Sequence, residues 1–218
     1  IYSFRQPLDL LGWLSELPLA QGLSVTVAVH DYFMLCPSLF LIDAAQRYCN
    51  LPAPSVCEAC RARLHTDFPT GADTIADWRA VWGTVMRRAS RILVFSGASA
   101  KLVTRVYPDC ADKIDLKPHS LALFPHRPLA PSMEAPLHIG VVGAISWHKG
   151  WEIIKALCEV IEGRGLPYRI TVIGSLIPEF TASCLSVTGP YGRGELPDRM
   201  RISGANLFFF PSIWPETF

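Results

Sequence analysis

The sequence lacks any apolar stretch that approaches the roughly 20 uncharged residues of a bilayer-spanning helix. Its first residues show no basic-then-apolar leader, so we expect no signal peptide. It also lacks an excess of charge of either sign, because the net charge is +1. Nucleic-acid binding usually needs a basic surface, so this balance gives no support for a nucleic-acid partner.

Several catalytic motifs are absent as well. The chain has no D-x-D metal motif, no G-x-S-x-G nucleophile turn, no H-E-x-x-H zinc helix and no closely spaced carboxylate pair of glycosidase type. The stretch VVGAISWHKGWEII over 141–154 matches neither a Walker loop nor G-x-G-x-x-G. These absences exclude the chemistry that each motif supports.

What is present is the composition of a globular protein with enough apolar side chains for a core. Half of the 218 residues are apolar and 18% are charged. The seven cysteines are an odd number in a chain too long to need disulfide staples, which favours a cytosolic location.

Apolar segments alternate along the chain with segments of helical spacing. We expect strands over 24–30, 91–96, 113–118, 137–143, 168–174, 185–189 and 206–212, and helices over 8–17, 75–90, 98–108, 151–163 and 194–203. Strands that are apolar throughout and alternate with helices predict parallel sheets covered on both faces. The predicted fold class is therefore α/β, with two Rossmann-like domains.

The proline-rich segment 124–136 separates the two halves and is the expected linker. We predict an N-terminal domain over 1–123, with an irregular cysteine-containing insertion at 31–75, and a C-terminal domain over 137–218. Both domains have fewer βα units than a complete doubly wound domain, so both are expected to be incomplete in this chain.

The turn between the strand at 137–143 and the helix at 151–163 carries the first candidate site. A helix N-terminus has unpaired N–H groups and a partial positive charge, which suits a phosphate. The helix dipole disfavours a cation such as Lys149 at that position, so a bound anion would explain the lysine. A solvated lysine at a loop edge is the alternative, and His148 is expected at the surface.

Two further candidates follow strands at the edge where ligands of open parallel sheets bind. Glu216, in PSIWPETF, is a carboxylate that could accept hydrogen bonds from the vicinal hydroxyls of a sugar. An acid in the first turn of a helix begun by Pro215 explains it equally well. His30, in AVHDYF, could orient a substrate or act in acid–base chemistry, or be a histidine satisfied within its loop.

Four cysteines gather in the insertion: Cys36, Cys49, Cys57 and Cys60, of which the last two form a C-x2-C pair. Four thiolates can hold a structural zinc ion. Free buried cysteines are the main alternative, and two disulfides fit a reducing compartment less well.

Taken together, HDY after a strand, VGAISWHKG and PSIWPETF resemble the retaining GT-B glycosyltransferases of family 4. The resemblance covers 137–218 and, in the first half, about 28–119, including CP at 36–37 and VFS at 94–96. In that family the C-terminal domain holds a nucleotide-activated sugar and the N-terminal domain holds the acceptor. The resemblance implies donor-binding roles for Gly143, Lys149, Gly150, Gly189, Pro190, Glu216, Thr217 and Phe218, and catalytic roles for His30 and Glu216.

The same resemblance implies transfer of a sugar, with retention, from a nucleotide diphosphate to a hydroxyl of a glycan or lipid-linked acceptor. No catalytic metal or other cofactor is expected, and any zinc at the cysteines would be structural. Cytoplasmic polysaccharide assembly, with contact at the inner face of a membrane, is the expectation at the level of the family.

The chain departs from the family pattern at two positions. Ala144 stands where the diphosphate turn often carries arginine, and the second glutamate of the family's Glu-x7-Glu motif would fall after Phe218. Two alternatives stay open: an epimerase or phosphorylase on the same fold, and a non-catalytic module that binds a partner through its cysteine insertion.

Overall fold

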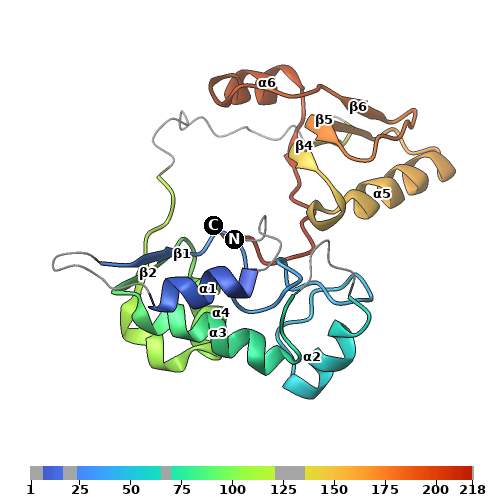
Figure 1. The fold of residues 1–218 in the computed structure, drawn as a ribbon. Coiled ribbons are helices and arrows are strands. Elements are labelled where there is room, and N and C mark those ends of the chain that lie inside the picture. The colour runs from blue at the N-terminus through green and yellow to red at the C-terminus, as the bar shows by residue number, and fades with distance from the viewer. Residues whose placement is uncertain (1–6, 17–23, 65–69, 121–135, 218) are drawn as a thin grey trace. The chain divides into compact units, whose positions relative to one another are not determined.

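The computed structural model describes residues 7–16, 24–64, 70–120 and 136–217. They form a mixed α/β protein with two parallel sheets, divided into two compact units (Figure 1). Unit 1 comprises Ile1–Ser120 and Trp214–Phe218, and unit 2 comprises Leu121–Ile213. The predicted linker lies almost wholly outside the described residues, as does Phe218.

Unit 1 is built on a three-stranded parallel sheet in the order β1-β2-β3. Its strands are β1 (Thr26–Ala28), β2 (Arg91–Val94) and β3 (Ile114–Leu116), and its helices are α1 (Pro7–Glu16), α2 (Pro54–Arg61), α3 (Ile75–Arg88) and α4 (Gly97–Val106), followed by the 3-10 helix η1 (Pro108–Lys113). The predicted elements of this half are confirmed, with shorter strands. The expectation that the strands are covered on both faces is wrong for β1, whose side chains are exposed or half-buried. β1 is an edge strand, because only β2 pairs with it among the described strands.

Helix α3 organises the core of unit 1. Thr74 caps its N-terminus in a reciprocal capping box with Asp77, and α1 and α2 both contact it. The indole of Trp78 is fully buried, packs edge-on against Phe33 at 4.8 Å, and donates a hydrogen bond to the Phe33 carbonyl oxygen at 2.8 Å. The first part of the 31–75 segment is therefore core structure, although it has almost no regular elements.

Unit 2 contains a four-stranded parallel sheet in the order β6-β5-β4-β7. Its elements are β4 (His138–Ile145), the 3-10 helix η2 (Trp147–Lys149), α5 (Trp151–Gly163), β5 (Arg169–Leu176), β6 (Leu185–Val187), the 3-10 helix η3 (Arg193–Glu195), α6 (Leu196–Ile202) and β7 (Leu207–Phe208). Helices α5 and α6 lie on opposite sides of the sheet (Figure 1). All elements predicted here are confirmed, although β7 is only two residues long.

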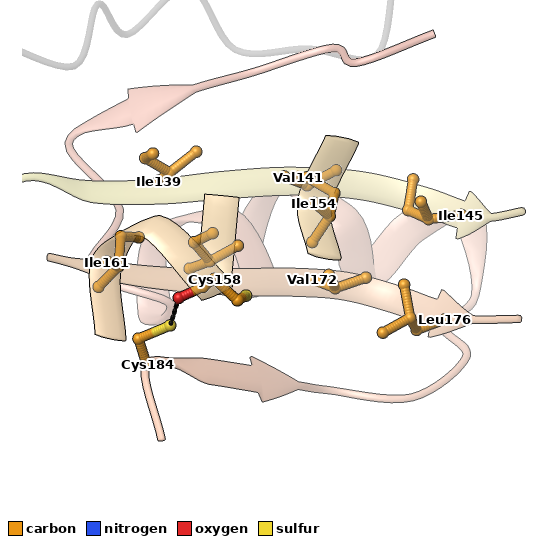
Figure 2. Close-up of a cluster of buried hydrophobic side chains, with 10 residues drawn as sticks. Ile139, Val141, Ile145, Ile154, Cys158, Ile161, Val172, Leu176 and Cys184 are labelled. Atoms are coloured by element: carbon orange, nitrogen blue, oxygen red, sulfur yellow. Dashed lines mark hydrogen bonds between the residues drawn. The ribbon is translucent and has the colours of Figure 1, made fainter. Parts of the chain in front are cut away.

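The core of unit 2 lies between the two central strands and α5. Residues of alternate positions on β4 and β5 face one stripe of α5, formed by Ile154, Cys158 and Ile161 (Figure 2). The spacing of that stripe is the i, i+4, i+7 pattern that identifies this helix in the sequence. The mainly apolar strands β4 and β5 thus fit a sheet covered on both faces.

Candidate functional site

The sheet of unit 2 has a topological switch point between β4 and β7. The chain leaves β4 through α5 to β5 on one side, and later returns through α6 to β7 on the other side. In open parallel sheets the crevice outside the carboxyl ends of such a strand pair is the usual ligand site. The loop after β4, which carries Lys149 and Gly150, and the segment after β7 both lie at this place.

The backbone at the switch point is closely packed. Gly150 has a left-handed φ of +85°, and a Cβ there would lie 2.2 Å from the carbonyl oxygen of Pro211. The amide of Ile213 donates to the carbonyl of His148 at 3.1 Å, and the amide of Lys149 donates to Ser146 at 2.9 Å. Glycine at position 150 is therefore required by both backbone conformation and space.

One other predicted donor position, Gly143, differs slightly from expectation. Gly143 lies inside β4 rather than in the turn, because the strand continues to Ile145. Its φ is +120°, and a Cβ on the paired Gly174 would lie 2.1 Å from its carbonyl oxygen, so both positions need glycine. The turn itself begins at Ser146.

Gly189 and Pro190 follow β6, on the far side of β5 from β4. Gly189 has a φ of +80° and open space where a Cβ would be. The preceding Thr188 accepts a hydrogen bond from the Gly174 amide at 3.2 Å, which ties this turn to the end of β5. The predicted donor residues of unit 2 therefore share one sheet edge.

In unit 1, the structure brings together two motifs that are far apart in the sequence. The hydroxyl of Thr217 donates to the backbone carbonyl of His30 at 3.1 Å. The carbonyl of Thr217 in turn accepts from the hydroxyl of Ser99 at 3.3 Å, and the Tyr32 hydroxyl lies 3.0 Å from that of Ser99. Thr217, Ser99 and Tyr32 are all essentially buried, so the network is shielded from water.

Trp214 anchors the same segment. Its ring packs edge-on against Tyr32 at 6.0 Å and Phe40 at 4.8 Å, and it is 8% exposed. This packing corrects the predicted domain boundary, because the chain belongs to unit 1 from Trp214 onward. Residues 214–217 carry no helix in the described structure. The interpretation of Glu216 as a first-turn acid stays a prediction, because the hydrogen bonds of a helix begun by Pro215 would come from residues after Thr217.

The carboxylate of Glu216 lies near Tyr32. Its Oε2 atom is buried, and its charge helps to raise the pKa of Tyr32, for which burial is the main cause. Burial likewise raises the pKa of Asp31, whose carboxylate accepts a hydrogen bond from the Phe33 amide at 2.8 Å. The Asp31 carboxylate therefore lies near His30, and the Glu216 carboxylate lies near Tyr32.

The imidazole of His30 is exposed and belongs to a stack of rings along the carboxyl edge of the sheet. It stacks on Phe95 with 4.9 Å between ring centroids, and Phe95 stacks on His119 at 4.3 Å. These rings follow β1, β2 and β3 respectively. Sequence reasoning missed His119, although the rule that identified His30, a histidine just after a strand, applies to it equally.

The four cysteines predicted as zinc ligands all line one pocket of about 560 Å³ in unit 1. None forms a disulfide. The pKa of Cys49 is raised to about 11, mainly by burial and in smaller part by the nearby thiols of Cys36, Cys57 and Cys60. Within the described ranges, no three His, Cys, Asp or Glu side chains are arranged closely enough to hold a metal ion as they stand.

A second pocket, of about 770 Å³, lies in unit 2 at the opposite edge of the sheet, where His138 and Arg169 begin β4 and β5. The imidazole Nε2 of His138 is 2.8 Å from the Thr171 hydroxyl, which is 2.8 Å from that of Ser186. Burial lowers the pKa of His138. None of the predicted site residues lines this pocket.

Comparison with known proteins yields no assignment: no protein-family model matches the chain, and no curated protein sequence matches it significantly. Among the helices in the described part of the chain, none has the length and hydropathy to cross a bilayer.

Proposed function

We propose that the chain is part of a retaining GT-B glycosyltransferase that transfers a sugar from a nucleotide diphosphate to a hydroxyl acceptor. The observation that carries the proposal is the hydrogen bond from Thr217 to His30, which joins the WPET segment to the strand end that carries HDY. These are two of the three main motifs on which the resemblance to the family rests. Their packing against each other is what a shared role around the transferred sugar requires.

Unit 2 supplies the groups for the nucleotide diphosphate. Lys149 and the N-terminus of α5 follow β4 at the switch point of the sheet, where anionic ligands of this fold class bind. As the bond between the anomeric carbon and the diphosphate oxygen breaks, negative charge develops on the leaving oxygen. Lys149 and the partial positive charge at the N-terminus of α5 stabilise that charge.

Unit 1 carries the residues that the resemblance assigns to the sugar. The Glu216 carboxylate accepts hydrogen bonds from its hydroxyls, and His30 lies beside the reacting ring. The acceptor hydroxyl attacks the anomeric carbon on the face from which the diphosphate leaves, and its proton passes to the departing diphosphate. No protein nucleophile and no metal ion enters this scheme. The acceptor is a glycan or lipid-linked glycan, in cytoplasmic polysaccharide assembly at the inner face of a membrane.

The proposal is tested by release of UDP or GDP from a panel of UDP- and GDP-sugars in the presence of glycan and lipid-linked acceptors. We expect release with one donor class, reduced about 100-fold or more by His30→Ala and Glu216→Gln. His119→Ala is the matched control, because it removes the outer ring of the stack and leaves the groups beside the sugar in place. No release with any donor, or equal rates in all three variants, would rule out the assignment.

A further inference from the structure

The four cysteines of the insertion reach one pocket from three different stretches of chain. Cys36 lies in the turns after Tyr32, Cys49 follows the isolated bridge between Ile42 and Tyr48, and Cys57 and Cys60 belong to α2. Residues three apart on a helix share a face, so the C-x2-C pair presents both thiols to the same side. The other three cysteines lie elsewhere, and those of unit 2 belong to its apolar core.

The backbone between these cysteines is unusual. Five non-glycine residues have left-handed φ angles between +48° and +64°, and all lie between Cys36 and α2: Leu39, Leu41, Gln46, Asn50 and Leu51. Such conformations are costly for residues with a Cβ and persist only where the surroundings enforce them. They concentrate at ligand-holding loops, which points to a cross-link in this segment.

Little regular structure holds this segment in place. Apart from the bridge between Ile42 and Tyr48, its backbone is tied by single turns, such as the hydrogen bond from the Tyr32 amide to the Leu39 carbonyl at 2.8 Å and that from Cys49 to Leu41 at 2.9 Å. A metal ion bound by thiolates is one way in which proteins fix an irregular segment.

The electrostatic surroundings favour an anionic cluster. The guanidinium of Arg79 on α3 lies 3.9 Å from the Cys57 sulfur and also donates to the Leu35 carbonyl at 3.0 Å. A zinc ion with four thiolates carries two negative charges, and a fixed arginine donor beside a sulfur offsets them. Arg63 lines the same pocket, as do Arg47 and Arg61, which form ion pairs with Asp43 and Glu58.

We propose that Cys36, Cys49, Cys57 and Cys60 bind one zinc ion in tetrahedral geometry and thereby fasten the insertion to α3. Binding releases four protons, one from each thiol, and involves no change of oxidation state. Because the thiols do not stand at ligating distances in the described structure, binding must draw the four side chains closer together. The site is structural and goes beyond the proposed transferase activity.

The first test is the zinc content of the whole chain, purified under reducing conditions with zinc supplied and measured by inductively coupled plasma mass spectrometry. We expect one zinc per chain, and loss of most of it in Cys57→Ala and Cys60→Ala. Cys110→Ala is the matched control, because this buried cysteine lies outside the pocket and its replacement leaves the zinc content unchanged. Metal-free protein, or zinc content that Cys57→Ala does not alter, would overturn the proposal.

The second test uses unaltered protein, so it does not depend on whether the variants fold. Cobalt(II) in place of zinc gives the visible bands of a tetrahedral thiolate site.

Alkylation with iodoacetamide, mapped by mass spectrometry, should leave the four cysteines protected until a chelator is added, whereas a reductant alone should not expose them. Exposure by reductant would indicate disulfides instead, and alkylation that is equally fast with and without zinc would exclude the site. Both readouts are independent of nucleotide binding.

Discussion

The hydroxyl of Thr217 donates a hydrogen bond to the backbone carbonyl of His30, across 187 positions of the chain. Two short segments thereby form one buried site: the end of β1 and the segment that follows β7. The neighbouring Ser99 holds the Thr217 carbonyl at 3.3 Å, so both backbone and side chain of Thr217 are tied to unit 1.

Thr217→Val removes the hydroxyl and preserves the shape of the side chain. A hydrogen bond of this kind contributes about 1 kcal/mol, so amide hydrogen exchange in the segment after β7 should become about fivefold faster. Mass spectrometry of peptides from this segment measures the change. Thr84→Val is the matched control, because the Thr84 hydroxyl bonds only within its own helix, to Val81. Unchanged exchange in Thr217→Val would show that the contact does not hold the segment.

Trp214→Ala should destabilise unit 1 by about 3–5 kcal/mol, because it leaves a cavity between Tyr32 and Phe40. Chemical denaturation with pulsed labelling of α3 peptides reports the unfolding of unit 1 by itself. The control Trp147→Ala removes an indole that is 42% exposed and belongs to unit 2, so it should not change the stability of unit 1. Equal effects on α3 in both variants would contradict the packing described for Trp214.

Much of this architecture could be predicted from the sequence, because its signals are local. The apolar runs of β4 and β5 and the helical stripe of α5 identify their elements directly. Helix α2 was missed because it buries no residue and thus shows no apolar stripe, although Pro54 at its first position was a usable start signal. The placement of Trp214 against Tyr32 could not be predicted, because it depends on contacts between segments that no local pattern connects.

In the candidate site of unit 2, too, the features with a local sequence signal were predictable and those that depend on distant contacts were not. Its glycines and Lys149 were recognisable as a turn after a strand, since that signal is local. The close approach of Gly150 to Pro211 was not, because it depends on β7 returning beside β4. The predicted seven-residue strand around β7 reduces to Leu207–Phe208 since the chain turns away from β4 toward Pro211.

Gly150→Ala should disturb the switch point of unit 2. Its added Cβ would lie 2.2 Å from the Pro211 carbonyl oxygen at a φ of +85°, so the loop after β4 must shift. We expect a lower thermal midpoint and weaker binding of nucleotide diphosphates. Gly163→Ala provides the comparison, because a Cβ there meets nothing within 4 Å, and it should be neutral or slightly stabilising. A fully stable Gly150→Ala would show that the loop is not tightly packed.

The pH dependence of unit 2 should contain a contribution from His138. Burial lowers its pKa in the folded state, with a smaller contribution from Arg169. As the pH falls below the usual value of 6.5, His138 therefore takes up a proton in the unfolded chain before it does so in the folded protein. The contribution of His138 to the free energy of unfolding is therefore complete above pH 6.5 and is lost as the pH falls through the folded pKa. Urea unfolding of unit 2 at a series of pH values should show this slope, and His138→Gln should flatten it. An unaltered slope in the variant would assign the effect to other groups.

The central claim is that unit 2 binds a nucleotide diphosphate through Lys149. Calorimetric titration of the protein with UDP and GDP tests it most directly. We predict binding of one of the two, weakened at least tenfold by Lys149→Ala and unchanged by Lys155→Ala, which removes the same charge from within α5, where Lys155 lies over the Trp151 ring. Equal affinity in wild type and Lys149→Ala, or no binding of either nucleotide, would contradict the account.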